Sequence, residues 1–138
     1  MITLVEALGY RSLRYISQPL GPFHVLVGPN ASGKTTFLDL IAFLGRLVSE
    51  GVDAAVGERT QNFYDLLWQR KGQRFELAVE ARIPELLRAR LTRKEFDRVR
   101  YEIVLGIDLD SQELGLQAES VLLKIGDSPL PKRALFPE

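Results

Sequence analysis

The pattern of apolar and polar residues in the first part of the chain predicts a β-hairpin followed by a buried strand. Residues 2–8 and 10–16 are two β-favouring stretches, separated by Gly9, and the segment 18–22, rich in proline and glycine, closes the second. Residues 23–27 form a short, nearly continuous apolar run, which is typical of a strand buried on both faces of a sheet. Gly28 ends this strand.

From Lys34 onward, apolar residues recur at helical spacing, at Phe37, Leu40, Ile41, Leu44, Leu47 and Val48. Gly51 follows this run, where a glycine commonly ends a helix. We therefore expect a helix from Lys34 to just before Gly51. A second, shorter helix is predicted over residues 61–70, with Gly72 closing it.

The second half of the chain has the pattern of an antiparallel meander. Residues 75–83 alternate apolar and polar side chains without a break, which predicts a strand with one buried face and one face in solvent. Pro84 opens a charged helical segment that extends to about Arg98, and residues 101–107 and 116–125 again have the pattern of strands. The proline-containing tail, residues 128–138, is expected to be irregular.

A phosphate-binding motif stands between the predicted buried strand and the long helix. It matches Gly-x-x-x-x-Gly-Lys-Ser/Thr over Gly28, Pro29, Asn30, Ala31, Ser32, Gly33, Lys34 and Thr35. Two glycines let backbone N–H groups converge on phosphates, and the following helix adds the positive end of its dipole. We expect Lys34 to act catalytically between the β- and γ-phosphates and the Thr35 hydroxyl to bind Mg²⁺. The alternative is a glycine-rich turn that only joins strand to helix.

The predicted nucleotide is ATP, because the chain lacks an Asn-Lys-x-Asp run of the kind by which many GTPases recognise guanine. A length of 138 residues suits one domain, and the formal net charge of zero gives no overall attraction to nucleic acid or membranes. The chain contains no cysteine, no secretory signal pattern and no apolar run long enough to span a membrane. We therefore expect a soluble cytoplasmic protein without membrane contact.

Other candidate residues favour structural roles. His24, within the predicted buried strand, has no second metal ligand at suitable spacing. Asp108 and Asp110 stand near a turn, although residues 103–108 superficially have the form of a Walker B strand. A segment rich in basic residues could contact nucleic acid, but its interspersed carboxylates favour a solvated helix; its cations are Arg82, Arg88, Arg90, Arg93, Lys94, Arg98 and Arg100.

Two stretches of the chain resemble the N-terminal segment of ABC-type ATPases of the RecF/SMC-like group, within the AAA family of P-loop ATPases. They are residues 9–13, Gly-Tyr-Arg-Ser-Leu, and residues 22–39, which contain the phosphate-binding motif. Residues 101–103 and 119–122 are more weakly similar to the antiparallel β-subdomain of those proteins. The resemblance implies an α/β fold, lobe I of an ABC-type head, with an antiparallel β-subdomain over about residues 73–127.

The resemblance also implies roles for individual residues. Arg11 would approach the phosphates, Thr36 would bind the α-phosphate and Asn30 would shape a phosphate loop that extends over residues 28–36. A convincing Walker B strand, the signature helix and the switch histidine are missing, and the glutamine of the Q-loop cannot be placed. We therefore expect residues 1–138 to be the N-terminal portion of a single ATPase domain, with negligible activity alone.

The partners that this resemblance implies are a C-terminal ATPase half, on the same or a separate chain, an ATP-dependent homodimer of complete heads, and nucleic acid. The implied processes are DNA repair, chromosome maintenance and defence against phage. Two alternatives stay open: a self-contained small P-loop kinase, for which no catalytic base is found, and a non-catalytic ATP-dependent interaction module.

Overall fold

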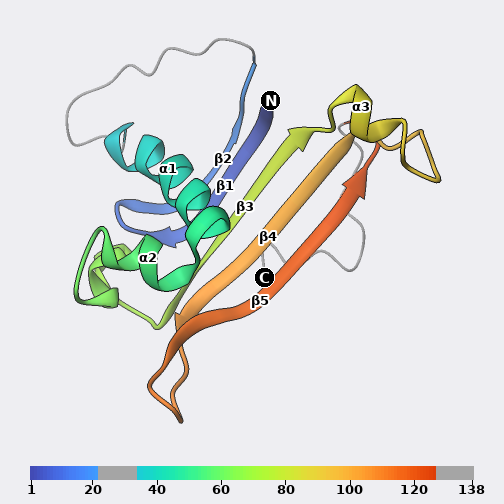
Figure 1. The fold of residues 1–138 in the computed structure, drawn as a ribbon. Helices are drawn as coiled ribbons and strands as arrows, with labels where there is room; N and C mark the ends of the chain where they lie inside the picture. The colour runs from blue at the N-terminus through green and yellow to red at the C-terminus, as the bar shows by residue number, and fades with distance from the viewer. Residues whose placement is uncertain (22–33, 127–138) are drawn as a thin grey trace.

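The computed structural model describes residues 1–21 and 34–126, which form a five-stranded antiparallel sheet (Figure 1). The first two helices lie over one face of this sheet, and a short third helix lies at its end (Figure 1). The strand order is β2-β1-β3-β4-β5. The elements are β1 (Ile2–Tyr10), β2 (Leu13–Pro19), α1 (Lys34–Glu50), α2 (Val52–Gly57), the 3₁₀ turns η1 (Phe63–Leu66) and η2 (Trp68–Arg70), β3 (Arg74–Arg82), α3 (Glu85–Arg88), β4 (Arg98–Ile107) and β5 (Leu114–Lys124).

The N-terminal hairpin and the meander are both confirmed. Strand β1 pairs with β2 on one side, with Ala7 opposite Ile16, and with β3 on the other, with Ala7 opposite Leu77. Strands β3, β4 and β5 then follow one another across the sheet as neighbouring antiparallel strands. The tight turn between β1 and β2 places residues 11 and 12 at one end of the sheet.

Helix α1 supplies one half of the hydrophobic core. Its apolar stripe, residues Phe37, Leu40, Phe43, Leu44 and Leu47, is buried in a cluster with sheet residues that include Val5, Ala7, Phe75 and Leu77. The predicted end of the helix is confirmed, because Gly51 adopts a φ of 94° and its N–H donates to the Leu47 carbonyl at 2.9 Å. Val48, which belongs to the predicted stripe, is instead 71% exposed.

The segment between α1 and β3 differs from the prediction. The helix expected over residues 61–70 is two short 3₁₀ turns, because Leu67 between them is extended and Gln69 and Arg70 have φ values of 54°. Helix α2, which was not predicted, follows α1 directly after Gly51 and contributes Ala55 and Val56 to the core.

The basic helix expected from Pro84 to Arg98 is also wrong, since only α3, four residues long, is helical. Leu86 is 86% exposed and Leu87 is 53% exposed, so this helix has no apolar face against the core. Short helices depend on such packing, which explains why the helical turn does not continue.

On the sheet face opposite α1, polar side chains are buried rather than solvated. We call Glu6, Glu80, Arg100, Glu102 and Lys124 the buried charge cluster. The Arg100 guanidinium lies 2.6 Å from a Glu6 oxygen, 2.7 Å from Glu80 and 2.6 Å from Glu102, and the Lys124 ammonium lies 2.8 Å from Glu80. The expectation of a wet face on β3 is therefore wrong at Glu80, and Arg100 is unavailable to an external anion.

The predicted strand over residues 23–27, the glycine loop that follows it and the C-terminal tail from Ser128 lie outside the described residues. His24 lies in the first of these segments.

Candidate functional site

Two residues in the first turns of α1 contact the turn between β1 and β2. The Ser12 hydroxyl donates to the Thr36 hydroxyl at 2.8 Å, and the Arg11 guanidinium donates to the Asp39 carboxylate at 3.1 Å. Residues far apart in sequence, 11–12 and 36–39, thus meet at the N-terminal end of α1. The first turn of a helix carries unpaired backbone N–H groups and the positive end of the helix dipole, so anions are favoured there.

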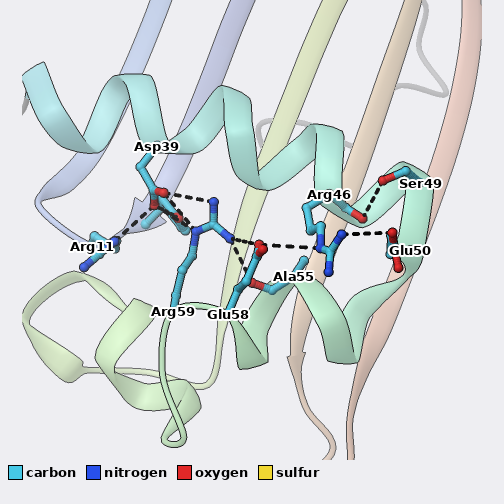
Figure 2. Close-up of polar contacts among 9 residues, drawn as sticks. Arg11, Asp39, Arg46, Ser49, Glu50, Ala55, Glu58 and Arg59 are labelled. Carbon is cyan, nitrogen blue, oxygen red and sulfur yellow. Dashed lines mark hydrogen bonds and ion pairs between the residues drawn. The ribbon is translucent and has the colours of Figure 1, made fainter.

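Asp39 is the centre of this site, because three side chains donate hydrogen bonds to its carboxylate. Figure 2 shows two of them, those of Arg11 and Arg59. Arg59 binds it through Nε and through a terminal nitrogen, each at 2.9 Å. The Tyr10 hydroxyl donates at 2.8 Å and Arg11 at 3.1 Å. One carboxylate is therefore held by a phenol from β1, a guanidinium from the β1–β2 turn and a second guanidinium from the segment after α2.

The two arginines are held differently. The Arg59 side chain is only 11% exposed, donates to the Ala55 carbonyl at 3.0 Å and lies 5.2 Å above the Phe43 ring. The Arg11 side chain is 41% exposed and forms an ion pair with Asp39. Arg59 is thus built into the core beside Asp39, whereas Arg11 reaches it from the solvent side.

The pKa values follow from this geometry. Burial opposes ionisation of Asp39, but the hydrogen bonds from Arg59 and Tyr10 outweigh it and hold the pKa of Asp39 below its ordinary value. Burial, and then the hydrogen bond to the Asp39 carboxylate, raise the pKa of Tyr10 well above its ordinary value. Asp39 is therefore ionised and Tyr10 is a neutral donor at physiological pH.

The backbone fixes the position of Arg11. This residue has a φ of 50°, in the left-handed region that few non-glycine residues adopt, and its N–H donates to the Leu66 carbonyl at 2.8 Å. A bridge between Tyr10 and Leu67 adds a second link to the same segment. The turn that bears Arg11 is thus tied to the 3₁₀ segment as well as to α1.

A second group of ion pairs continues along α1 toward its C-terminus (Figure 2). Arg46 lies 2.9 Å from Glu50 and 3.5 Å from Glu58, and Glu58 lies 3.4 Å from Arg59. These contacts join α1 to the residues that follow α2 and so support the position of Arg59.

The predicted site residues are distributed as follows. Gly28, Pro29, Asn30, Ala31, Ser32 and Gly33 lie outside the described residues. Lys34 is the first residue of α1, and the exposed Thr35 and half-buried Thr36 follow in its first turn. Arg11, which the family resemblance places near the phosphates, is bonded to Asp39, just beyond the first turn of α1.

Sequence reasoning missed the roles of Asp39 and Arg59. Asp39 interrupts an otherwise apolar helical stretch close to the N-terminus of α1, which is a signal that could have singled it out. No comparable signal marks Arg59, whose partner is twenty residues away in sequence.

Asp108 and the basic segment have local structural partners. The Asp108 carboxylate accepts hydrogen bonds from the N–H groups of Asp110 and Ser111, each at 2.9 Å, and these lower its pKa. It opens the loop between β4 and β5, which are antiparallel. In the basic segment, Arg93 pairs with Glu95 at 2.6 Å.

Within residues 1–21 and 34–126, no group of three or more histidine, cysteine or carboxylate side chains is arranged to hold a metal ion. None of the helices described is long and apolar enough to cross a membrane.

Comparisons with known proteins identify the family. Residues 23–124 match the model of a family described as "AAA domain, putative AbiEii toxin, Type IV TA system". Among solved structures, the chain is similar to one described as "Structural biochemistry of ATP-driven dimerization and DNA stimulated activation of SMC ATPases", with a TM-score of 0.56 and 20% identity over 90% of this chain and 69% of that one. No curated protein matches the sequence. Because the family match spans well over half of the sequence, the chain belongs to this AAA-domain family and has the ABC/AAA-type P-loop ATPase fold, a fold of nucleotide-binding proteins.

Proposed function

We propose that the chain binds Mg-ATP through residues 28–36. The observation that carries this proposal is the coincidence of a complete phosphate-binding motif with the start of a 17-residue helix at Lys34, in a chain that belongs to an ATPase family. A long helix that begins at the end of such a motif directs its free backbone N–H groups at the phosphates.

Individual roles follow from the chemistry of the motif. Lys34 would offset negative charge on the β- and γ-phosphates, and the exposed Thr35 hydroxyl would bind Mg²⁺ together with phosphate oxygens. Magnesium at such sites is held by few protein ligands and by the phosphates themselves. Thr36, whose hydroxyl is oriented by Ser12, would contact the α-phosphate. The exposed guanidinium of Arg11 would add a further cation.

The wider function that we propose is that of the N-terminal portion of an ATPase head, with the phosphate loop at 28–36 and the β-subdomain at about 73–127. Hydrolysis would require a C-terminal half that supplies the Walker B and signature residues. Two complete heads would form a homodimer on ATP, in contact with nucleic acid, in the cytoplasm. The similar SMC ATPases, described in terms of ATP-driven dimerization and DNA-stimulated activation, support this proposal. DNA repair, chromosome maintenance and defence against phage are the processes it would serve.

Thermal unfolding with and without Mg-ATP tests the site. A ligand at about a hundred times its dissociation constant adds about 2.7 kcal/mol to the native state, which raises the melting temperature by several degrees. Lys34→Ala should abolish this rise, and Lys71→Ala, at an exposed lysine outside the motif, should preserve it. An equal rise in wild type and Lys34→Ala would refute the site.

A further inference from the structure

We propose that Arg59 is a positioning residue for the nucleotide site: it neutralises Asp39, so that Arg11 can transfer its guanidinium from Asp39 to the phosphates of the nucleotide. This inference rests on the proposed Mg-ATP site and assigns a function to the network around Asp39.

The Asp39 carboxylate carries one negative charge and contacts two guanidinium groups, those of Arg11 and Arg59. One of these cations is enough to balance it. If Arg11 leaves, Asp39 still has Arg59 and the Tyr10 hydroxyl, which donates at 2.8 Å. If Arg59 is removed instead, Arg11 becomes the cation that Asp39 requires, because leaving a partly buried carboxylate without a cation is costly.

The contacts of the two arginines decide which of them can leave Asp39. Arg59 contacts Asp39 through two nitrogens at 2.9 Å, donates to the Ala55 carbonyl and covers the ring of Phe43. Leaving Asp39 would break several of these contacts at once. Arg11 gives up one hydrogen bond of 3.1 Å, and its side chain is 41% exposed. Arg11 is therefore the labile partner and Arg59 the permanent one.

The destination of the Arg11 guanidinium is the phosphate site at the start of α1. The backbone of Arg11 is anchored through the Leu66 carbonyl, so the base of its side chain stays beside the first turns of α1 while the guanidinium moves. Its neighbour Ser12 is bonded to Thr36, in the first turn of that helix. A triphosphate at this helix end carries more negative charge than a single carboxylate, and guanidinium groups match phosphate geometry well. The phosphates thus compete successfully for Arg11 as long as Arg59 satisfies Asp39.

The test is a set of Mg-ATP dissociation constants for wild type and variants, measured by titration with each variant's melting temperature as a check on folding. Arg11→Ala should weaken binding about tenfold or more, since hydrogen bonds between charged groups have that effect. Arg59→Gln should weaken it similarly because Asp39 then retains Arg11. Arg59→Lys, which keeps the positive charge, should bind nearly as wild type.

Two double variants separate positioning from a general structural role. Asp39→Asn combined with Arg59→Gln should restore binding, because the carboxylate that retains Arg11 is gone. Arg59→Gln combined with Arg11→Ala should bind no more weakly than Arg11→Ala alone. The inference would be overturned if Asp39→Asn failed to restore binding to Arg59→Gln, or if adding Arg59→Gln to Arg11→Ala weakened binding further. Wild-type affinity in the single variant Arg59→Gln would also overturn it. If wild type and Lys34→Ala bind Mg-ATP equally, the proposed site itself is refuted.

Discussion

The buried charge cluster provides a stringent test of how the sheet is held together. Arg100 has no exposed side-chain surface and bonds the carboxylates of Glu6, Glu80 and Glu102 at 2.6–2.7 Å. Arg100→Met keeps much of the side-chain volume but leaves Lys124 as the only cation of that five-residue cluster. Removing one partner from a buried ion pair costs about 3–5 kcal/mol.

That loss is large compared with the stability of an ordinary domain, which is about 5–15 kcal/mol. For a chain of this size it corresponds to a fall in melting temperature of about 10–15 °C. Thermal or urea unfolding followed by circular dichroism measures it. Arg93→Met is the matched control, because Arg93 also lies 2.6 Å from a carboxylate oxygen, that of Glu95, but its side chain is 69% exposed. Exposed ion pairs contribute little, so the control should melt close to wild type. Equal stabilities for the two variants would refute the assignment of Arg100 to a buried network.

Three further outcomes are expected. Asp39→Asn should destabilise the chain at neutral pH. Because the folded-state pKa of Asp39 is lowered, the difference in melting temperature between this variant and wild type should persist down to about pH 4 and shrink as the pH falls further. A pH series of melting curves checks this. The chain alone should hydrolyse ATP negligibly, and Asp108→Ala should not change its turnover. Steady-state turnover of about 1 s⁻¹ that is lost in this variant would favour a self-contained enzyme. Duplex DNA should bind the basic segment weakly at most, as measured by fluorescence anisotropy at two salt concentrations. Tight binding that is abolished by reversing the charges of Arg88, Arg90 and Arg93 would instead show that the segment is a DNA site.

The parts of the fold that could be predicted from sequence are those in which a repeated apolar pattern coincides with burial. Helix α1 is such a case, because the spacing from Phe37 to Leu47 matches the face that packs on the sheet, and Gly51 ends the helix with a positive φ. The strands of the meander are predicted for the same reason. The error over residues 61–70 arose because apolar residues at helical spacing do not reveal the left-handed conformations of Gln69 and Arg70.

Alternation alone could not show that the second face of the sheet is buried. Polar residues at every second position of a strand usually face water, and the sequence pattern of Glu80 and Glu102 is the same in either case. Their burial depends on Arg100, which reaches them from β4 and bonds Glu6 on β1, 94 residues away in sequence. Such long-range pairing has no local signal.

In the candidate site, too, local motifs could be predicted from sequence and long-range contacts could not. The phosphate-binding motif is local, so Lys34 and Thr35 could be singled out from sequence, and Thr36 was added through the family resemblance. The network around Asp39 depends on the fold, since it joins Tyr10 and Arg11 on the hairpin to Arg59 after α2. Arg11 was singled out only through resemblance to a family, and its bond to Asp39 was not foreseen.

Calorimetric titration of the chain with Mg-ATP measures the proposed nucleotide site directly. We expect saturable binding of one nucleotide per chain in wild type, and loss of that binding in Lys34→Ala while Lys71→Ala retains it. We also expect much weaker binding when Mg²⁺ is removed with EDTA, since the Thr35 hydroxyl would act through the metal. Undiminished binding by Lys34→Ala, or the absence of binding by wild type at millimolar nucleotide, would contradict a Mg-ATP site at residues 28–36.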